Sequence, residues 1–425
     1  MNSKTTRLWI ISLMIVFMML GASWGTWFTR FPTIRETLNL SLTEMSFLVL
    51  LPSVGMIGGL LIASRLVVLL GERVVIIAGI SIMGVMLPAA TWTLLLDGSG
   101  SAFFGHSLLF IFGAGFGIAD VATNVSGSNA ERAAGTSRMM VMHAGFSVGG
   151  IASVLFGAWA EHAKLGLLTH QISTFAIFIV TTVFLSRWIG TSPALRFSPA
   201  QHSSATQHSS PTHNSSAIHN SGESQTLRSS TTEDPPASSA KMRVWRNPVV
   251  LLLGFIGLAG SLADGVAADW MPLAFIDEYG LESGPAVFML SLMFTGELIM
   301  RLFGDKFVSR FGRKKVLRAT LTSAFIGILL VALSPSAWLA APGAFLWGAG
   351  AALAFPISIS AAASDPRTAA SKVSAVSTIG YTAYAGGPVA FGVMGDHLGF
   401  RIAFLMLAVI IVLAWFGSAA VKDQN

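Results

Sequence analysis

Asp120 lies inside a long apolar stretch of this sequence, where an ionisable side chain needs a physical reason. A charged side chain in the middle of a membrane costs roughly 2.5–3.5 kcal/mol on insertion scales, and such residues are therefore rare. On a helix, Gly113, Gly117 and Asn124 share a face with Asp120. Glycines let another helix approach closely, so we expect this face to point into a bundle. The carboxyl group would then bind a proton or a substrate hydroxyl; a structural hydrogen bond to a neighbouring helix is the alternative.

Two more aspartates, Asp264 and Asp269, lie together in a later apolar stretch. Asp264 shares its face with small residues, as Asp120 does, and we expect it to be buried and to carry protons. These small residues are Gly257, Gly260, Ser261 and Ala268. Asp269 is closer to the outer end, where it would act in a gate or pair with Arg30. Arg30 itself ends the first apolar stretch, and it is either a gate residue or an anchor at the membrane interface.

Imidazole, hydroxyl and aromatic side chains in the apolar stretches suit a substrate cavity. His143 and Ser147 lie on one helical stripe, and an imidazole there suits a proton relay, unless it is a structural histidine satisfied by its neighbours. Tyr381 and Tyr384 accompany a face of serines and threonines that suits a sugar or polyol, although helix packing explains the hydroxyls equally well. The expected cavity residues are Trp24, Trp27, Asn124, His143, Ser147, Tyr381 and Tyr384.

Glu297, Arg301 and Asp305 follow one another at intervals of four residues. That spacing places them on one helical face, where opposite charges pair. They come near the cytoplasmic end of their apolar stretch. We interpret Arg301 between two acids as part of a gating network rather than a substrate site.

The composition excludes a soluble enzyme. The chain has 425 residues, of which 53% are hydrophobic and 11% charged, whereas soluble domains carry about 25% charged residues. The net charge of +6 does not indicate nucleic-acid binding, because the basic residues lie in short connections between apolar runs. There is no cysteine, which excludes disulfides and thiolate metal sites.

Twelve stretches are long and apolar enough to cross a membrane as helices, which predicts an all-α membrane protein with twelve transmembrane helices. In the first half they cover about 8–29, 42–64, 74–96, 103–126, 139–160 and 168–187. In the second half they cover about 247–271, 284–304, 316–334, 337–362, 370–394 and 400–420.

A polar segment divides the two halves. Residues 197–240 are almost entirely Ser, Thr, His, Pro and Asn, a composition that cannot bury enough apolar surface to order itself. We therefore predict a six-helix bundle over 1–190, a disordered linker over 191–245 and a second bundle over 246–425. The linker histidines His202, His208, His213 and His219 suit weak metal binding, but a solvated tether is the interpretation we favour.

The basic residues predict the orientation in the membrane. All but four of the 26 lysines and arginines fall at the termini, in the even-numbered connections or at their helix ends. The exceptions are Arg30, Arg35, Lys164 and Arg401. Because basic residues accumulate on the cytoplasmic side, we expect both termini and the linker to be cytoplasmic, in a bacterial inner membrane.

The two halves also resemble each other. The run FIFGAGFGIAD that begins at Phe110 matches FLWGAGAALAF from Phe345, and HAGFS from His143 matches TIGYT from Thr378 at the same offset. A parallel repeat of six helices predicts a pseudo-twofold axis along the membrane normal, with a substrate site between the halves at mid-depth.

These motifs resemble the major facilitator superfamily over essentially all of both halves. The connection GDKFVSRFGRKK (304–315) is similar to its Gly-Asp-Arg-Gly-Arg-Arg gating motif, although Ser309 stands where an acid usually lies. The resemblance implies gating roles for Arg310 and Arg313. Its counterpart SRLVVLLGERV (64–74) keeps only Gly71 and Arg73.

Four further stretches resemble the YbjJ-type bacterial inner-membrane branch, which is related to fucose-permease-like transporters. They are SWGTWFTRFPTIR (23–35), GAGFGIADVATNV (113–125), MHAGFSVGG (142–150) and ADWMPL (268–273). The resemblance supports a role for Asp120, because fucose-permease-like transporters carry an acid in the fourth helix. It names no cargo.

The sequence thus favours a secondary transporter of a small polar solute, such as a sugar, polyol or small organic acid, driven by protons through Asp120 first and Asp264 second. We expect a monomer in contact with membrane lipid, without cofactor, metal or nucleic acid. An enzyme is disfavoured because no nucleophile–base pair appears, and the GAGFG run of 113–117 lies in a membrane segment rather than after a strand. A drug or metabolite exporter, and a non-transporting sensor or scaffold, are the alternatives.

Overall fold

The computed structural model describes residues 3–96, 100–135, 138–190, 245–364 and 368–421, and its elements are helices. The first half contains α1 (Ser3–Phe28), α2 (Phe31–Leu38), α3 (Leu42–Leu70), α4 (Glu72–Leu94), α5 (Ser101–Ala134), α6 (Met139–His162) and α7 (Leu167–Ser186). The second half contains α9 (Pro248–Tyr279), α10 (Ser283–Phe311), α11 (Arg313–Leu333), α12 (Ala337–Ala351), α13 (Ala354–Ala362), α14 (Ala369–Leu398) and α15 (Phe400–Gly417), followed by a short 3-10 turn (Ser418–Ala420). The predicted linker lies outside the described residues, apart from its last residue.

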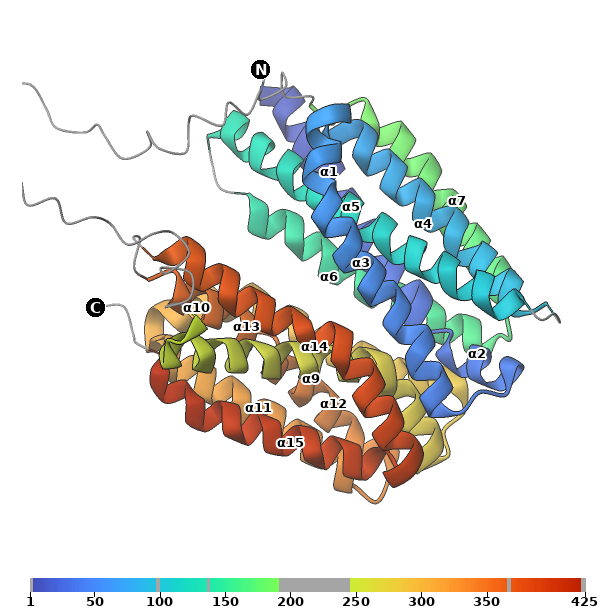
Figure 1. Ribbon diagram of the computed structural model, residues 1–425, viewed down its shortest axis with the longest axis vertical. Helices are drawn as coiled ribbons and strands as arrows, with labels where there is room; N and C mark the ends of the chain where they lie inside the picture. Colours follow the sequence, from blue (N-terminus) through green and yellow to red (C-terminus); the bar gives the residue numbers. More distant parts are fainter. Residues whose placement is uncertain (1–2, 97–99, 136–137, 191–244, 365–367, 422–425) are drawn as a thin grey trace, which may run out of the picture.

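The all-α membrane fold predicted from the sequence is confirmed. Figure 1 shows two bundles of long helices side by side, with the blue-to-green half and the yellow-to-red half in separate groups. Within the described residues, eleven helical segments are long and apolar enough to span a membrane. The remaining predicted span is α14, a helix of 30 residues. It carries the serines, threonines and tyrosines that the sequence suggested for a cavity.

Two features of the helices were missed from the sequence. A short helix, α2, follows α1 directly, with Pro32 in its first turn, a position that proline favours. The predicted span 337–362 is divided into α12 and α13, with the break at Ala352 and Leu353. Pro356 explains the break, because it has no N–H for the carbonyl of Ala352 and its ring clashes with that carbonyl.

The internal repeat corresponds to equivalent packing in the two halves. A Cβ on Gly113 of α5 would lie 1.9 Å from the carbonyl oxygen of Pro52 in α3. A Cβ on Gly348 of α12 would lie 1.9 Å from the carbonyl oxygen of Met293 in α10. Only glycine allows backbones to come so close, so the repeated GAG run fixes the same helix pair in each bundle.

The two bundles are joined at the end of the molecule that carries α2, which we call the closed end (Figure 1). Here α3 packs against α14, and α6 packs against α10. Since α3 corresponds to α10 and α6 to α14 in the repeat, a pseudo-twofold axis relates these two contacts. Arg35 pairs with Asp277 across the interface at 2.7 Å. The Asp396 carboxylate accepts a hydrogen bond from the Thr43 hydroxyl at 2.6 Å. We call the opposite end, where α1 begins and α15 ends, the terminal end.

Candidate functional site

A cavity of about 280 Å³ lies between the two bundles and is lined by residues of both. From the first bundle its wall contains Gly21, Trp24, Gly25, Phe28, Ser53, Met56, Leu60, Phe116, Asp120, Phe146, Ser147 and Gly150. From the second it contains Asp264, Gly265, Ala268, Asp269, Phe294, Glu297, Arg301 and Tyr381. This position between the repeats is where the sequence led us to expect a site.

The wall from the first bundle is mainly aromatic. The Trp24 and Phe28 rings, one helical turn apart on α1, stack with centroids 5.3 Å apart. Phe116 of α5 meets Trp24 edge-on at 5.3 Å, and Phe146 of α6 meets Phe116 at 6.4 Å. Edge-to-face contacts of this kind hold aromatic rings in fixed orientations. The first bundle therefore presents four aromatic rings in mutual contact to the cavity.

The wall from the second bundle is acidic. Asp269 and Glu297 are only 5% and 4% exposed, although both border the cavity. Arg301 forms an ion pair with Glu297 one turn earlier on α10. The carboxyl group of Asp264 interacts with those of Asp269 and Glu297. Three carboxyl groups and one guanidinium group thus form a single cluster on α9 and α10.

Asp120, on the wall of the first bundle, belongs to a short hydrogen-bonded chain. Its Oδ1 accepts a hydrogen bond from Asn124 Nδ2 at 3.2 Å, and the Asn124 Oδ1 lies 3.0 Å from His143 Nε2. Because Asn124 Oδ1 is an acceptor, this geometry assigns the hydrogen of the contact to His143 Nε2. The chain links α5 to α6. Asn124 and His143, which we expected in the cavity, are not among the residues that line it, and His143 is exposed.

The structure brings part of the predicted set of residues together at the cavity. Asp120, Asp264, Asp269, Trp24, Ser147 and Tyr381 all line the cavity. The expectation that Trp27 lines it is wrong, because Trp27 is 1% exposed and packs edge-on against Phe31 inside the first bundle. Tyr384 lies on α14, but its side chain is outside what the structure describes.

Glu297 and Arg301 are not at the cytoplasmic end of their helix, where the sequence analysis placed them with Asp305. They border the cavity, whereas Asp305 lies two turns farther along α10 and is exposed. Arg313 donates a hydrogen bond to Ser364 at 3.3 Å, and Arg310 lies 5.3 Å from the centroid of Phe311. Both contacts stay within the second bundle, so these two arginines do not bridge the bundles through them.

The pairing proposed between Arg30 and Asp269 is wrong, as is an interfacial anchor. Arg30 is 1% exposed, and its Nη1 lies 3.4 Å from Oε1 of Glu161. Its Nη2 donates a hydrogen bond to the carbonyl of Leu165 at 2.6 Å, while Thr33 donates to Glu161 at 2.7 Å. This buried cluster ties the end of α1 to the α6–α7 connection at the closed end. Glu161 was overlooked because it lies in the last turn of its helix, a usual place for a solvated charge.

We expect Arg30→Ala to lower the free energy of unfolding by about 3 kcal/mol, because it leaves the Glu161 carboxylate buried without a cation. The double variant Arg30→Ala/Glu161→Gln should recover a clear part of that loss. Arg65→Ala, at an exposed position, is the control and should be neutral. Thermal unfolding of the purified variants measures the effect. Equal losses for the single and double variants would contradict the electrostatic explanation.

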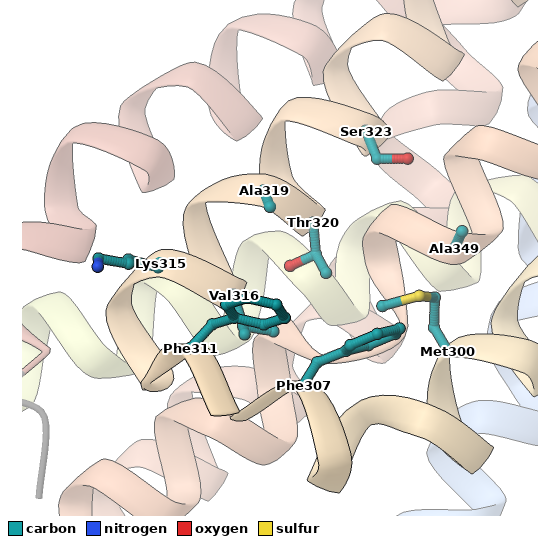
Figure 2. Close-up of a pocket in the computed structure, with 9 residues that line it drawn as sticks. All are labelled: Met300, Phe307, Phe311, Lys315, Val316, Ala319, Thr320, Ser323 and Ala349. Atoms are coloured by element: carbon teal, nitrogen blue, oxygen red, sulfur yellow. The ribbon is translucent and has the colours of Figure 1, made fainter. Parts of the chain in front are cut away.

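A second hollow, of about 420 Å³, is a groove between α10, α11 and α12. Figure 2 shows the rings of Phe307 and Phe311 near the Met300 side chain, with the Lys315 ammonium group to one side. No carboxylate lines it, and its residues come from one bundle only. The described residues contain no group of three or more His, Asp or Glu side chains arranged to hold a metal ion. The central cavity is therefore the candidate site.

Comparison with known proteins gives one family. The family model described as Major Facilitator Superfamily matches residues 13–388 and 288–423. An uncharacterized transporter, y4wD, of Sinorhizobium fredii is 28% identical over 94% of this chain and 95% of its own length. An uncharacterized MFS-type transporter of Yersinia pestis is 25% identical over 97% of this chain and 95% of its own length.

Solved structures show the same fold at low sequence identity. The nucleoside transporter NupG superposes with a TM-score of 0.69 at 14% identity, covering all of both chains. A bacterial homologue of the human lysosomal transporter Spinster, in an inward-facing and unoccupied conformation, gives 0.66 at 15%, again over both whole chains. The E. coli fucose:proton symporter FucP gives 0.56 at 17%, over 98% of each chain.

Proposed function

Because this chain belongs to the Major Facilitator Superfamily, we propose that it is a secondary active transporter that moves a small polar solute by alternating access, coupled to protons. One observation carries the proposal. A cavity bordered by carboxyl groups lies between two pseudo-symmetric bundles that are joined by polar contacts at one end. Rocking of the bundles about that cavity would expose it to the two sides of the membrane in turn.

The proposed coupling residues are Asp120 and Asp264, on opposite walls of the cavity. A carboxyl group can exchange a proton with water when the cavity is open and must be neutralised when it is closed off, because an unpaired charge is costly in a dry interior. Asp120 is supported further by its chain of hydrogen bonds through Asn124 to His143. The fucose:proton symporter of the same fold is consistent with proton coupling.

We place the protein in a bacterial cytoplasmic membrane with the terminal end in the cytoplasm. The support is the distribution of basic side chains. Arg65, Arg310 and Lys315 lie toward the terminal end, whereas the closed end carries the four exceptions: Arg30, Arg35, Lys164 and Arg401. The positive-inside rule then makes the closed end extracytoplasmic, and the cavity would be reached from the cytoplasm.

Transport in reconstituted vesicles tests the proposal. Purified protein is first screened by thermal shift against sugars, polyols, small acids and small amines, because a ligand at one hundred times its Kd stabilises the folded state by about 2.7 kcal/mol. The compounds that stabilise the protein are then tested for transport into proteoliposomes with and without an imposed pH gradient. Accumulation or depletion that follows the gradient supports a proton-coupled transporter. A ligand that binds but is never moved in either direction would indicate a sensor instead.

Deleting residues 200–238, while leaving a short tether, separates a transporter from a scaffold. We expect the deletion to leave transport within about twofold of the intact chain, because it leaves intact the helices whose residues line the cavity and make the contacts at the closed end. Transport of the same substrate in matched proteoliposomes is the measurement. A scaffold that binds its partner through the linker would lose function with the deletion.

A further inference from the structure

We propose that the cargo of the central cavity is a small organic cation, an amine with an apolar or aromatic body. The inference rests on the proposed function, in that it takes the central cavity as the transport site. It replaces the sugars, polyols and acids expected from the sequence. It follows from the charge of the cavity lining, the arrangement of its two walls and the scarcity of neutral polar groups.

The charge of the lining favours a cation. The cavity is bordered by four carboxyl groups, those of Asp120, Asp264, Asp269 and Glu297, and by one guanidinium group, that of Arg301. The guanidinium is itself paired with Glu297. A carboxylate substrate would enter against this excess of acids, and like charges repel strongly where water is excluded. The cavity is therefore unsuited to an organic acid.

The layout of the walls suits an amphipathic amine. The rings of Trp24, Phe28 and Phe116 lie on the wall from the first bundle, which also carries Asp120. The carboxyl groups of Asp269 and Glu297 lie on the wall from the second bundle. An ammonium group placed on the acids would turn the body of the same molecule toward the rings. Aromatic faces also attract cations directly, most strongly the indole of tryptophan. The volume of about 280 Å³ is near the lower limit for ligand pockets, so the molecule is small.

Neutral hydrogen-bonding groups are few in the part of this lining that the structure describes. They are the hydroxyl groups of Ser53, Ser147 and Tyr381 and the indole N–H of Trp24, and the described lining includes no asparagine or glutamine. A sugar presents several hydroxyl groups, each of which needs a partner once it leaves water. Because these three hydroxyl groups lie on three different helices, most hydrogen bonds to a sugar would have to come from the carboxyl groups. Carboxylates bind a cation more strongly than a sugar hydroxyl, because charge-assisted hydrogen bonds are about twice as strong as neutral ones.

The same carboxyl groups would then hold either protons or cargo. Asp120 faces Tyr381 across the cavity and accepts a hydrogen bond from Asn124, which contacts His143. Asp264 faces Asp269 and Glu297, whereas Arg301 faces Glu297 and His143. An ammonium group that binds among them displaces protons, and protons that return displace the ammonium group. Competition between the ammonium group and protons for the acids of this cavity gives cation–proton exchange, which favours the exporter alternative within the same superfamily.

Isothermal titration of the purified full-length chain tests this with three probes of similar shape, namely 2-phenylethylamine, 2-phenylethanol and 3-phenylpropionate, and with a short series of other primary amines. We expect an amine to bind at least about tenfold more tightly than the neutral and anionic probes, a difference of about 1.4 kcal/mol. Titrations in buffers with different heats of ionisation should show protons released as the amine binds.

Matched variants locate the binding. Asp269→Asn and Glu297→Gln should each weaken amine binding by about tenfold or more, and Trp24→Leu by several-fold. Glu282→Gln removes an exposed carboxylate at the start of α10, outside the cavity, and should leave binding unchanged. Thermal unfolding confirms that each variant is folded. If a variant does not fold, competition by protons in the intact chain serves instead: amine affinity should rise with pH.

The inference is overturned if the alcohol or the carboxylate binds as well as the amine, or if no amine in the series binds. In those cases a sugar, polyol or acid that is moved by the proteoliposomes would leave the proposed function standing. Failure of the proposed function would look different, because a bound amine would then be neither accumulated nor exchanged across the vesicle membrane.

Discussion

Asp120→Asn is expected to abolish proton-driven accumulation or depletion of the cargo while leaving exchange of cargo for cargo intact. The amide keeps the size of the carboxyl group and an oxygen that still accepts the hydrogen bond from Asn124. It cannot take up or release a proton. The variant should therefore keep the shape of the cavity and lose only the part of the cycle in which a proton moves with or against the cargo.

The measurement compares two assays on the same proteoliposomes. Movement driven by an imposed pH gradient should fall at least about tenfold, whereas counterflow of labelled cargo should stay within about threefold of the unmodified chain. Glu282→Gln is the control, since it removes a carboxylate outside the cavity. If gradient-driven movement survives in Asp120→Asn, the coupling residue lies elsewhere, and the acids of the second bundle become the next variants to test.

The sequence was a good guide to this residue because two signals agreed. An acid in a membrane span is conspicuous, and the glycines of its face indicate close helix contacts. A Cβ on Gly117 would indeed lie 2.3 Å from the carbonyl oxygen of Met56 on α3. Periodicity gives the face of a residue, however, and not its depth. That is why Glu297 and Arg301 were expected near the cytoplasmic end of their helix and are found at the cavity.

Partners from distant segments could not be predicted. Arg30 and Glu161 meet only because α6 returns to the closed end beside α1, and nothing in the residues around Arg30 identifies that contact. Trp27 was expected in the cavity together with Trp24, yet the two rings face different neighbours. The spans themselves were predictable, since the thickness of the bilayer fixes the length of a helix that crosses it. The break between α12 and α13 could have been predicted from Pro356 itself, but a count of apolar residues does not detect a proline inside a span.

The closed end offers the sharpest test of alternating access, because a covalent link there should stop transport completely. The chain has no cysteine, so two can be introduced without other changes. Thr43 and Asp396 touch across the two bundles at 2.6 Å. In Thr43→Cys/Asp396→Cys, oxidation or a short bifunctional maleimide should hold α3 against α14 and fix the cavity open to one side only. Transport should fall to roughly a tenth or less, because a two-state cycle that cannot reach one state has no turnover.

A pair within one bundle supplies the matched control. Arg401 and Glu278 form an ion pair at the same end with a separation of 3.0 Å, but both belong to the second bundle. Cross-linking Glu278→Cys/Arg401→Cys should therefore leave transport close to its uncrosslinked level. Reduction of the disulfide in Thr43→Cys/Asp396→Cys should restore transport, which separates locking from damage. A fully cross-linked protein that still transports would show that the bundles need not part at this end, and alternating access about the central cavity would have to be abandoned.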